Sequence, residues 1–589
     1  MKRILACLIA MGVLMPSASV RAEENDTSFT ILYTNDVHCA IDGYAPFGGY
    51  QAALEAQGKT VIAVDAGDCI QGEMIGTFTK GEAIIDLMNE VPYDIAVPGN
   101  HEFDYKVDQL HRLADERAKF PYICCNYTDN GTNETVYDPY LIMEADGYKI
   151  GFVGMVTPET YIKSTPTNFM DEDGNYLYSF HETDLYDTVQ SAVDAAREAG
   201  ADIVIAVGHM GVNGIMQGYR SIDVIEHTRG INAFIDGHSH EVVEGPDYNG
   251  TLYRNLDGEV VPLTQTGTKF AAFGEMTVSL NGKGKDLSVS VETHLIEPDS
   301  VELTGAGAEQ SAVIQKLIDA DNALVEEVAG EVVGYSDVFL RTYEDDKKEW
   351  RVRTQETNSG DLLADAYRWT MGADICLINA GSVRADVAEG ELKAKDLIAL
   401  CPWALNTCLL RVKGQAVIDT LERGAEMLPE TFGGFIQVSG LSYEVNTYYE
   451  SPVETDEKGM MTGIDDSKPR RVFNVRVNGE PIDPDRNYTV ATNLYLGQED
   501  GDGHTVLSDS EVISTNYPTD TELLIGYVEE GLNGHITKEQ YGNADGEGRI
   551  IVHAEPAPAA SAELTIWQKI LVAAVGAVLI WLLVRSPKK

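Results

Sequence analysis

The sequence predicts an α/β protein with two domains joined by a long helix. Short apolar runs alternate with helical patterns over residues 28–300, as in a sheet whose strands are connected by crossover helices. A long amphipathic stretch follows, and beyond it the pattern changes to shorter strands and hairpin signals. The length of 589 residues exceeds what a single core supports, which agrees with two or more domains.

Six apolar runs in the first domain have the length and composition of β-strands. They are Phe29–Thr34, Thr60–Asp65, Asp94–Pro98, Tyr148–Val156, Asp202–Val207 and Asn232–Asp236. Helical stretches such as Ser191–Gly200 lie between them. Because ligands of such sheets bind beyond the carboxyl ends of the strands, the polar residues that follow these runs are candidates for a site.

Residues 301–330 are predicted to form a linker helix between the domains. Its apolar residues recur at helical spacing: Val313, Leu317, Ala320, Leu324 and Val328. Residues 331–552 form the second domain, in which Val477-Asn478-Gly479-Glu480 signals a two-residue hairpin turn. The polar, Gly- and Asp-rich residues 450–470 are expected to form an exposed loop.

Both ends of the sequence carry signals for export and membrane attachment. Residues 1–22 have the basic start, apolar run and small-residue cleavage site of a signal peptide. Residues 566–584 are long and apolar enough to cross a bilayer, between a Pro/Ala linker at 553–565 and a basic tail at 585–589. A buried core helix and a cleaved lipid-anchor signal are the alternatives. We expect a secreted, membrane-anchored protein with extracellular catalytic domains and a cytoplasmic tail.

The composition excludes several classes of partner. A formal net charge of −51 disfavours nucleic acid polymers and anionic membrane surfaces. An anionic substrate must therefore be held by local cations. The seven cysteines outside the predicted signal peptide are scattered and odd in number, which is not a disulfide framework. Nothing in the sequence indicates an oligomeric state.

Five short polar motifs follow apolar runs of the first domain. They are Asp36-Val37-His38, Gly67-Asp68, Gly99-Asn100-His101-Glu102, Gly208-His209 and Gly237-His238-Ser239-His240. Residues two apart on a strand point to one side, so Asp36 and His38 are expected to share a face. Alone, each motif is more often a turn, a cap or a core histidine. Together, the carboxylate, imidazole and amide donors predict two divalent metal ions, and they suit Zn, Mn, Fe or Co better than Mg or Ca.

The order of these motifs resembles that of the calcineurin-like metallophosphoesterases. More narrowly, Tyr33–His38 and Gly99–Asp104 resemble the 5′-nucleotidases, including the periplasmic UDP-sugar hydrolases. Matching stretches in the second domain are Asn379–Arg384, Gln437–Leu441 and Gly501–Gly503. The resemblance implies a four-layer metallophosphoesterase β-sandwich flanked by helices for residues 25–300. For residues 331–552 it implies the α/β substrate-binding domain of a 5′-nucleotidase.

The resemblance also implies which residues hold the metals and assist the reaction. One metal is held by Asp36, His38, Asp68 and His240, and the other by Asp68, Asn100, His209 and His238. Nucleotidases often carry an amide side chain at the position of His240, so metal preference is expected to differ. His101, oriented by Asp104, would stabilise charge at the phosphate or assist the leaving group. The alternative for Asp104 is a carboxylate at a helix N-terminus.

Substrate recognition is assigned by the resemblance to the second domain. Arg353 and Arg384 match positions that hold the phosphate or the nucleoside end, and Asn379 matches a base or ribose contact. Trp403 and Tyr495 match two aromatic rings that sandwich the base, and Asp502 would accept hydrogen bonds from ribose hydroxyls. Thr357 departs from the pattern because some members place a further arginine there. The division of labour between domains implies that they close about the linker helix.

These expectations combine into a metal-dependent 5′-nucleotidase. It would release phosphate from nucleoside 5′-phosphates by metal-activated water, and its range would extend to nucleoside diphosphates, triphosphates or UDP-sugars. The nearest alternative is a 2′,3′-cyclic-nucleotide 2′-phosphodiesterase/3′-nucleotidase, whose members tend to have Asn at the position of Asp104. The alternative from another class is a surface-anchored nucleotide-binding protein with a relic metal site.

Overall fold

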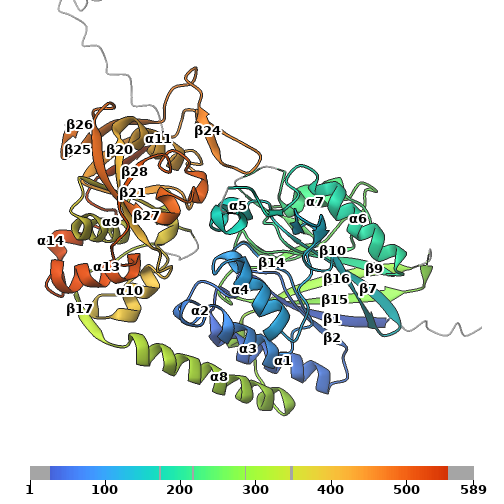
Figure 1. Cartoon of the computed structure of the whole chain (residues 1–589). Coiled ribbons are helices and arrows are strands. Elements are labelled where there is room, and N and C mark those ends of the chain that lie inside the picture. The colour runs from blue at the N-terminus through green and yellow to red at the C-terminus, as the bar shows by residue number, and fades with distance from the viewer. Residues whose placement is uncertain are drawn as a thin grey trace, which may run out of the picture.

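The computed structural model describes residues 27–554, except 172–173, 215, 217, 285–286 and 345–348. It contains two domains connected by helix α8 (Ala306–Ala329), which runs along the outside of the first domain and crosses to the second (Figure 1). The predicted signal peptide, the segment 566–584 and the basic tail lie outside the described residues. Among residues 27–554, no helix has the length and apolar character needed to span a bilayer.

The first domain contains two β-sheets packed face to face. One sheet has the order β16 (Ser288–Ile296), β15 (Phe273–Asn281), β1 (Thr27–Thr34), β2 (Val61–Asp65) and β3 (Ile95–Ala96). The other has the order β11 (Val242–Val243), β14 (Leu263–Thr266), β10 (Ala233–Ile235), β9 (Ile203–His209), β7 (Tyr148–Val156) and β6 (Tyr140–Ala145). Their facing sides share a core that includes Phe29, Val64 and Phe152.

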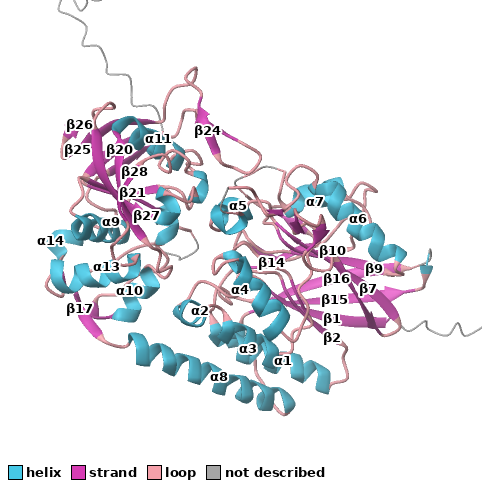
Figure 2. Cartoon of the chain, viewed as in Figure 1, coloured by secondary structure: helices cyan, strands magenta, loops and turns pink. Residues whose placement is uncertain are grey.

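Helices cover the outer face of each sheet (Figure 2). Packed against the first sheet are α1 (Tyr44–Ala56), α3 (Glu82–Glu90) and α4 (Val107–Arg112). Packed against the second are α6 (Leu185–Glu198) and α7 (Ser221–His227). The result is a four-layer sandwich of helices, two sheets and helices. All six predicted strands are present.

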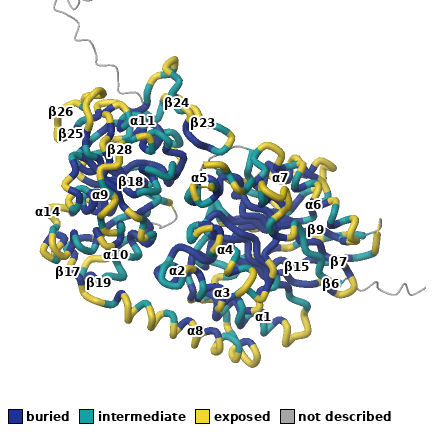
Figure 3. Tube along the Cα trace, viewed as in Figure 1, coloured by how far each residue is buried: buried dark blue, intermediate teal, exposed yellow. Residues whose placement is uncertain are grey.

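The strand directions place their carboxyl ends at one edge of the sandwich. β1, β2 and β3 pair in parallel in the first sheet, and β7, β9 and β10 pair in parallel in the second. The interior strands are buried, while the helices expose their outer sides (Figure 3). Loops that follow these strands therefore meet at one edge.

The linker helix forms as predicted, but the apolar residues that were expected to face a neighbour are exposed. Ile314 and Ile318 are buried, whereas Val313, Leu317, Leu324 and Val328 are exposed by 37% to 56%. The first half of α8 packs on α1 through a narrow stripe, and its second half crosses between the domains with little covering it (Figure 3). Helical spacing alone does not show which of two adjacent apolar stripes a neighbour will cover.

The second domain is built around a five-stranded sheet with two smaller sheets beside it. The main sheet has the order β21 (Ile436–Ser439), β18 (Ile375–Asn379), β27 (Asn487–Asn493), β20 (Thr407–Lys413) and β28 (Glu511–Ser514). Helices α9 (Asn358–Met371) and α11 (Gly414–Gly424) pack against its strands. The predicted hairpin is confirmed, because Val477 pairs with Glu480 where β25 (Val472–Val477) turns into β26 (Glu480–Pro481).

Residues 450–470 form a hairpin instead of the predicted exposed loop. β23 (Val453–Thr455) pairs with β24 (Met461–Ile464), and the turn between them contacts the first domain. Met460 belongs to an apolar cluster of the first domain that includes Tyr161 and Ile162, and Lys458 forms an ion pair with Glu182. The Nζ atom of Lys458 also lies 4.4 Å from the ring centroid of Tyr161. The sequence did not indicate these two strands, because the segment is polar and each strand is too short to show alternating polar and apolar residues.

Candidate functional site

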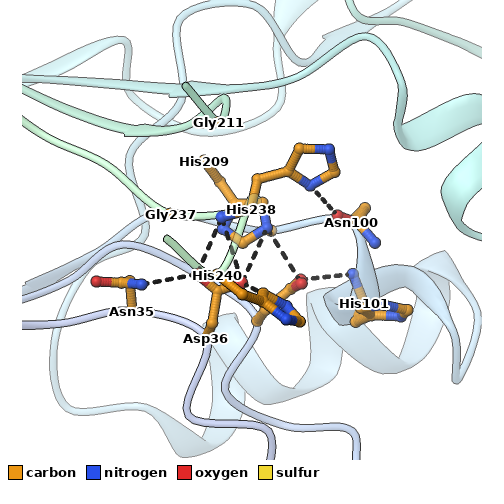
Figure 4. A network of polar contacts seen from close by, with 12 residues as sticks. Asn35, Asp36, Asn100, His101, His209, Gly211, Gly237, His238 and His240 are labelled. Atoms are coloured by element: carbon orange, nitrogen blue, oxygen red, sulfur yellow. Dashed lines mark hydrogen bonds and ion pairs between the residues drawn. The ribbon is translucent and has the colours of Figure 1, made fainter. Parts of the chain in front are cut away.

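The five polar motifs of the first domain meet at the edge where the parallel strands end. Figure 4 labels residues from four of them. Strand alternation is not the reason that Asp36 and His38 lie together, because β1 ends at Thr34. Both residues follow the strand with φ angles of 50° and 46°. Positive φ also occurs at Asp68, His238 and His240. Residues other than glycine rarely adopt this conformation, and its concentration here marks a constrained site.

Glycines allow these loops to approach one another. A Cβ atom on Gly67 would lie 2.6 Å from the backbone nitrogen of Gly99. A Cβ atom on Gly99 would lie 2.3 Å from Oδ1 of Asp68. Neither position has room for a side chain, so the glycine before each polar residue brings the second and third loops into contact.

Four of the predicted ligands form one compact group. Asp36, His38, Asp68 and His240 place donor atoms within 4.8 Å of one another. The Nε2 atoms of His38 and His240 are 3.0 Å apart, and Nε2 of His240 lies 3.3 Å from Oδ1 of Asp36. Two nitrogens bound to one ion at about 2.0–2.1 Å would be roughly this far apart. This group fits a divalent cation.

The other predicted ligands form two further contacts. Nε2 of His209 lies 3.1 Å from Oδ2 of Asp68, and Nδ1 of His238 lies 2.8 Å from Oδ1 of Asn100. The Nε2 atom of His209 is buried, and its contact with Asp68 is an ion pair that lacks the geometry of a hydrogen bond. A metal ion would give this nitrogen a partner of suitable geometry. The ring centroids of His209 and His238 are 5.2 Å apart.

Three of these histidines are oriented through their remaining ring nitrogen. Nδ1–H of His38 donates to the carbonyl oxygen of Gln71 at 2.9 Å, and Nδ1–H of His209 donates to that of Ala66 at 2.7 Å. Nε2–H of His238 donates to the carboxylate of Glu159 at 3.1 Å. An acceptor on one nitrogen fixes the tautomer and leaves the other nitrogen free to bind a metal.

The electrostatics of the site favour positive charge. Burial would raise the pKa of Asp36, but the imidazoles of His240 and His209 lower it to about 2. Burial would lower the pKa of His209, but the carboxylates of Asp68 and Asp36 raise it to about 10. The paired carboxylates thus stabilise a cation at the point where the donor atoms converge.

Two glutamates that the sequence analysis did not assign hold the site together. The buried carboxylate of Glu102 accepts hydrogen bonds from the backbone N–H groups of Asp68, Cys69, Ile70 and Gly99. Glu102 thereby fixes the second and third loops. Its position within the Gly99–Glu102 motif was the one sequence signal that could have identified this role. Glu159 orients His238 from the loop after β7, where no recognised motif pointed to it.

His101 and Asp104 form the predicted pair. Nδ1–H of His101 donates to Oδ2 of Asp104 at 2.5 Å, and Oδ1 of Asp104 accepts from the hydroxyl of Ser164 at 2.8 Å. The backbone N–H of His101 donates to Oδ1 of Asp68 at 2.8 Å. Burial would lower the pKa of His101, but Asp104 and Asp68 raise it above its ordinary value. These contacts favour the pair over a simple helix-terminal carboxylate.

One cavity joins this centre to the second domain. Its volume is about 1440 Å³, and its lining includes His101 and all six predicted substrate residues: Arg353, Asn379, Arg384, Trp403, Tyr495 and Asp502. Nδ2 of Asn379 donates to Oδ2 of Asp502 at 3.0 Å, which links two of them directly. Thr357 accepts a hydrogen bond from the N–H of Gly360 at the start of α9, so it has a structural role in place of a cation.

The two aromatic residues of the cavity make different contacts. The Trp403 ring lies 5.4 Å from that of His101, and its Nε1–H donates to the carbonyl oxygen of Gly381. The hydroxyl of Tyr495 donates to the carbonyl oxygen of Ile162 in the first domain at 3.1 Å. Trp403 is therefore next to His101, and Tyr495 bridges the domains.

A third aromatic residue, Trp350, was missed by the sequence analysis. Its ring centroid lies 4.1 Å from Cζ of Arg353 and 4.9 Å from Cζ of Arg384. Stacking of this kind holds a guanidinium group in place and stabilises its charge. Trp350 lies outside the stretches that resembled a known family, and no spacing pattern singles it out.

Comparison with known proteins identifies both domains. The calcineurin-like phosphoesterase family model matches residues 29–242, and the 5′-nucleotidase C-terminal domain model matches residues 332–509. Together they span about two thirds of the chain.

Curated relatives and a solved structure agree with this match. The chain is 26% identical to the "5'-nucleotidase" of Vibrio cholerae, over 89% of this chain and 94% of the relative. It is 24% identical to the "2',3'-cyclic-nucleotide 2'-phosphodiesterase/3'-nucleotidase" of Salmonella typhimurium, over 84% and 83%. It is 26% identical to the "Trifunctional nucleotide phosphoesterase protein YfkN" of Bacillus subtilis, over 82% of this chain, and spans about a third of that protein, 32%.

The structure is also similar to that of a 5′-nucleotidase precursor from Thermus thermophilus. The TM-score is 0.72 at 23% identity, over 90% of this chain and all of that chain. At this level of identity the likeness shows a shared fold. The chain therefore belongs to the calcineurin-like phosphoesterases that carry a 5′-nucleotidase C-terminal domain, and it is a metal-dependent phosphoester hydrolase.

Proposed function

We propose that this protein hydrolyses nucleoside 5′-phosphates to nucleoside and phosphate with two divalent metal ions, Zn, Mn, Fe or Co. The observation that carries the proposal is the single cavity lined by the ligand groups and His101 on one side and by Arg384, Asn379 and Asp502 on the other. A phosphate ester with a ribose attached would span these two sides.

Different residues of this chain would activate the water, supply a proton and bind the phosphate. Two cations bound by the ligand groups would polarise the phosphate oxygens and lower the pKa of water. His101, whose pKa is raised by Asp104 and Asp68 against the effect of burial, holds a proton near the phosphate and the leaving oxygen. Arg384 is 4% exposed and makes no side-chain hydrogen bond within the described part of the chain, so its charge is available to the phosphate.

The nucleoside would lie at the second-domain end of the cavity. Asp502 and Asn379 already share a hydrogen bond and present a carboxylate and an amide for the ribose hydroxyls. Tyr495 lies beside them and offers a ring for the base. The proposal places hydrolysis outside the cell, on a chain attached to the membrane by residues 566–584, as the terminal sequences indicate.

A second candidate is hydrolysis of 2′,3′-cyclic nucleotides and 3′-nucleotides. The Salmonella typhimurium relative has a name of this kind, and its alignment covers nearly as much of the chain as that of the Vibrio cholerae relative. Asp104 favours the 5′ reaction, because enzymes of the cyclic-nucleotide type tend to have Asn at this position.

A substrate panel tests the proposal. The purified chain would be assayed with AMP, 3′-AMP and 2′,3′-cyclic AMP in the presence of Mn, Co or Zn. We expect the highest kcat/KM for AMP. Faster turnover of the cyclic substrate would favour the second candidate. Purified protein without bound metal, and without turnover of any nucleotide after metal is added, would instead indicate a binding protein.

A further inference from the structure

The carboxylate of Asp104 has a hydrogen-bond donor on each of its two oxygens. Oδ2 accepts Nδ1–H of His101 at 2.5 Å, and Oδ1 accepts the hydroxyl of Ser164 at 2.8 Å. The torsion angle that turns a carboxylate about its bond to Cβ has broad minima, so a donor on one oxygen alone leaves the group free to turn. The hydroxyl of Ser164 removes this freedom and determines which way the carboxylate faces.

The hydroxyl of Ser164 is committed to this contact. Ser164 is 1% exposed, and within the described part of the chain its hydroxyl has no partner other than Asp104. The side chain of Asp104 is 13% exposed. In such surroundings water does not readily take the place of a lost donor, so the hydrogen bond from Ser164 is worth more than an exposed one.

The backbone of Ser164 is itself held in place by contacts on the preceding helix. Ser164 follows α5 (Thr160–Lys163), and its N–H donates to the carbonyl oxygen of Thr160 at 3.1 Å. The carbonyl oxygen of Ile162 in this helix accepts the hydroxyl of Tyr495 from the second domain at 3.1 Å. A donor on a fixed backbone can impose one orientation on its acceptor.

A second contact joins the same segment to the turn that carries His101 and Asp104. The short helix Pro166–Phe169 begins two residues after Ser164, and Nδ2 of Asn168 donates to the carbonyl oxygen of Phe103 at 3.0 Å. This contact fixes where the backbone of the turn lies. The direction of the Asp104 carboxylate is left to the hydroxyl of Ser164.

The direction of that carboxylate decides where the ring of His101 lies. Because Nδ1 of His101 is bound to Asp104, Nε2 is the nitrogen that remains for a substrate. The ring centroid of His101 lies 5.4 Å from that of His38 and 5.4 Å from that of Trp403, between the ligand group and the second domain. A displacement of about 1 Å in a group that acts on a reacting atom can cost roughly a hundredfold in rate.

We propose that Ser164 is a positioning residue for phosphoester hydrolysis: its hydroxyl orients Asp104 and, through Asp104, the ring of His101. Ser164 acts without touching the substrate. Because Ser164 also lines the cavity, direct contact with the substrate is the alternative. The inference rests on the proposed function, in which His101 acts at the phosphate and the leaving oxygen.

The test is a double-mutant cycle measured on AMP hydrolysis by the full chain loaded with metal. We expect Ser164→Ala to lower kcat roughly 10–100-fold, the usual cost of losing an outer hydrogen-bond partner, with KM and bound metal unchanged. In Asp104→Ala the hydroxyl has nothing to orient, so adding Ser164→Ala should cause no further loss. Ser164→Cys keeps a weak donor at the same position and should lie between wild type and Ser164→Ala.

The matched control is Thr160→Val, which removes another buried hydroxyl from the same helix. The hydroxyl of Thr160 donates to the carbonyl oxygen of Thr157 at 2.6 Å, within its own turn. Thr160→Val should therefore keep the kcat of wild type. Circular dichroism and melting temperature would show that both variants are folded.

Three results would overturn the inference. An unchanged kcat in Ser164→Ala would show that His101 keeps its place without the hydroxyl. A raised KM with an unchanged kcat would show direct contact with the substrate. Losses that multiply in the double variant would show an effect that bypasses Asp104. A wild-type protein that does not hydrolyse AMP, or a His101→Ala variant as fast as wild type, would instead overturn the proposed function and this inference with it, so the two failures are distinguishable.

Discussion

At the scale of single residues, His101 contacts carboxylates of two different kinds. Its ring donates to Asp104, and its backbone donates to Asp68, which belongs to the candidate ligand group. We therefore expect its role to be separable from metal binding.

Substitution of this pair should reduce turnover without removing metal. We expect His101→Ala to lower kcat by roughly 10²–10⁴-fold, the usual contribution of a positioned acid or base. Asp104→Asn should cause a smaller loss, because the ring stays in place while the charge that raises its pKa is removed. Steady-state kinetics and metal analysis of the same preparations would check both.

The contrast with a ligand variant makes this test specific. Asp36→Asn should lose metal and activity together, since Asp36 belongs to the compact ligand group. Equal loss of metal and turnover in His101→Ala would contradict the assignment of His101.

Trp350 should matter through the two arginines it covers. Trp350→Ala removes a ring that lies 4.1 Å from Arg353 and 4.9 Å from Arg384. Each cation–π contact is worth about 0.5–2 kcal/mol, so KM for nucleotide should rise severalfold with a smaller change in kcat. Trp350→Phe should lie between wild type and alanine. An unchanged KM in both variants would show that the arginines are held by other contacts.

Residue types and their order were enough to predict that Asp36, His38, Asp68 and His240 come together. Chemistry restricts which side chains bind metals, and five motifs in sequence narrow the choice further. The reason given for Asp36 and His38 was wrong, because positive φ angles bring them together after the strand has ended. Glu159 and Trp350 could not be predicted, since each depends on a three-dimensional neighbour that no spacing records.

At the scale of elements, the hairpin of β23 and β24 fixes how the two domains meet. Met460 packs into the core of the first domain, and the hydroxyl of Tyr219 donates to the carbonyl oxygen of Glu457. The Nζ atom of Lys458 lies over the rings of Tyr161 and Tyr176 and pairs with Glu182. The hairpin stabilises the arrangement in which the cavity is lined by both domains.

Removing the Lys458 contacts should favour a more open arrangement. Lys458→Ala loses an ion pair and two cation–π contacts, so a smaller fraction of molecules would be ready to bind substrate and KM would rise severalfold. Small-angle X-ray scattering should show a larger radius of gyration without ligand.

A matched control lies in the same region of the chain. Lys468 pairs with Glu450 at 3.6 Å, and Glu450 is 83% exposed in its side chain. An exposed pair within one domain contributes little, so Lys468→Ala should leave KM and the radius of gyration as in wild type. If KM and the radius of gyration of Lys458→Ala also equalled those of wild type, the hairpin would not hold the domains together.

Sequence pattern predicted most elements and failed where tertiary contacts decide. Tyr148–Val156 matches its strand at both ends because a continuous buried run carries a strong signal. The buried residues of α8 lie one position after the predicted ones, because α1 packs on Ile314 and Ile318. Residues 450–470 were misjudged because their hairpin depends on contact with the other domain.

At the scale of the whole molecule, metal binding should contribute to stability. The centre brings Asp36 and Asp68 close together in buried surroundings, where their charges need compensation. A ligand that binds only the folded state adds about 4 kcal/mol of stability at a thousand times its dissociation constant.

Chelation should therefore lower the melting temperature of the first domain. We expect scanning calorimetry after treatment with EDTA to show a lower first transition, and addition of Mn or Zn to restore it. Asp36→Asn should melt at one temperature with or without metal. A wild-type protein that is indifferent to EDTA would argue against a metal centre at these residues.

Fold class and domain order followed from the sequence at this scale because alternating strands and helices allow few architectures. The way in which the two domains share a cavity did not follow from it. That arrangement depends on the hairpin turn and on the contact between Tyr495 and Ile162, which join positions far apart in the sequence.

The exposed second half of α8 affects how often the second domain meets the candidate metal site of the first domain. The helix is a covalent tether, and it keeps the nucleoside contacts at a high effective concentration relative to the metal ligands. A protease cut near Leu324 or Val328 would turn this intramolecular encounter into a bimolecular one. Hydrolysis by the nicked protein would then fall on dilution, as it does for an enzyme reconstituted from two fragments.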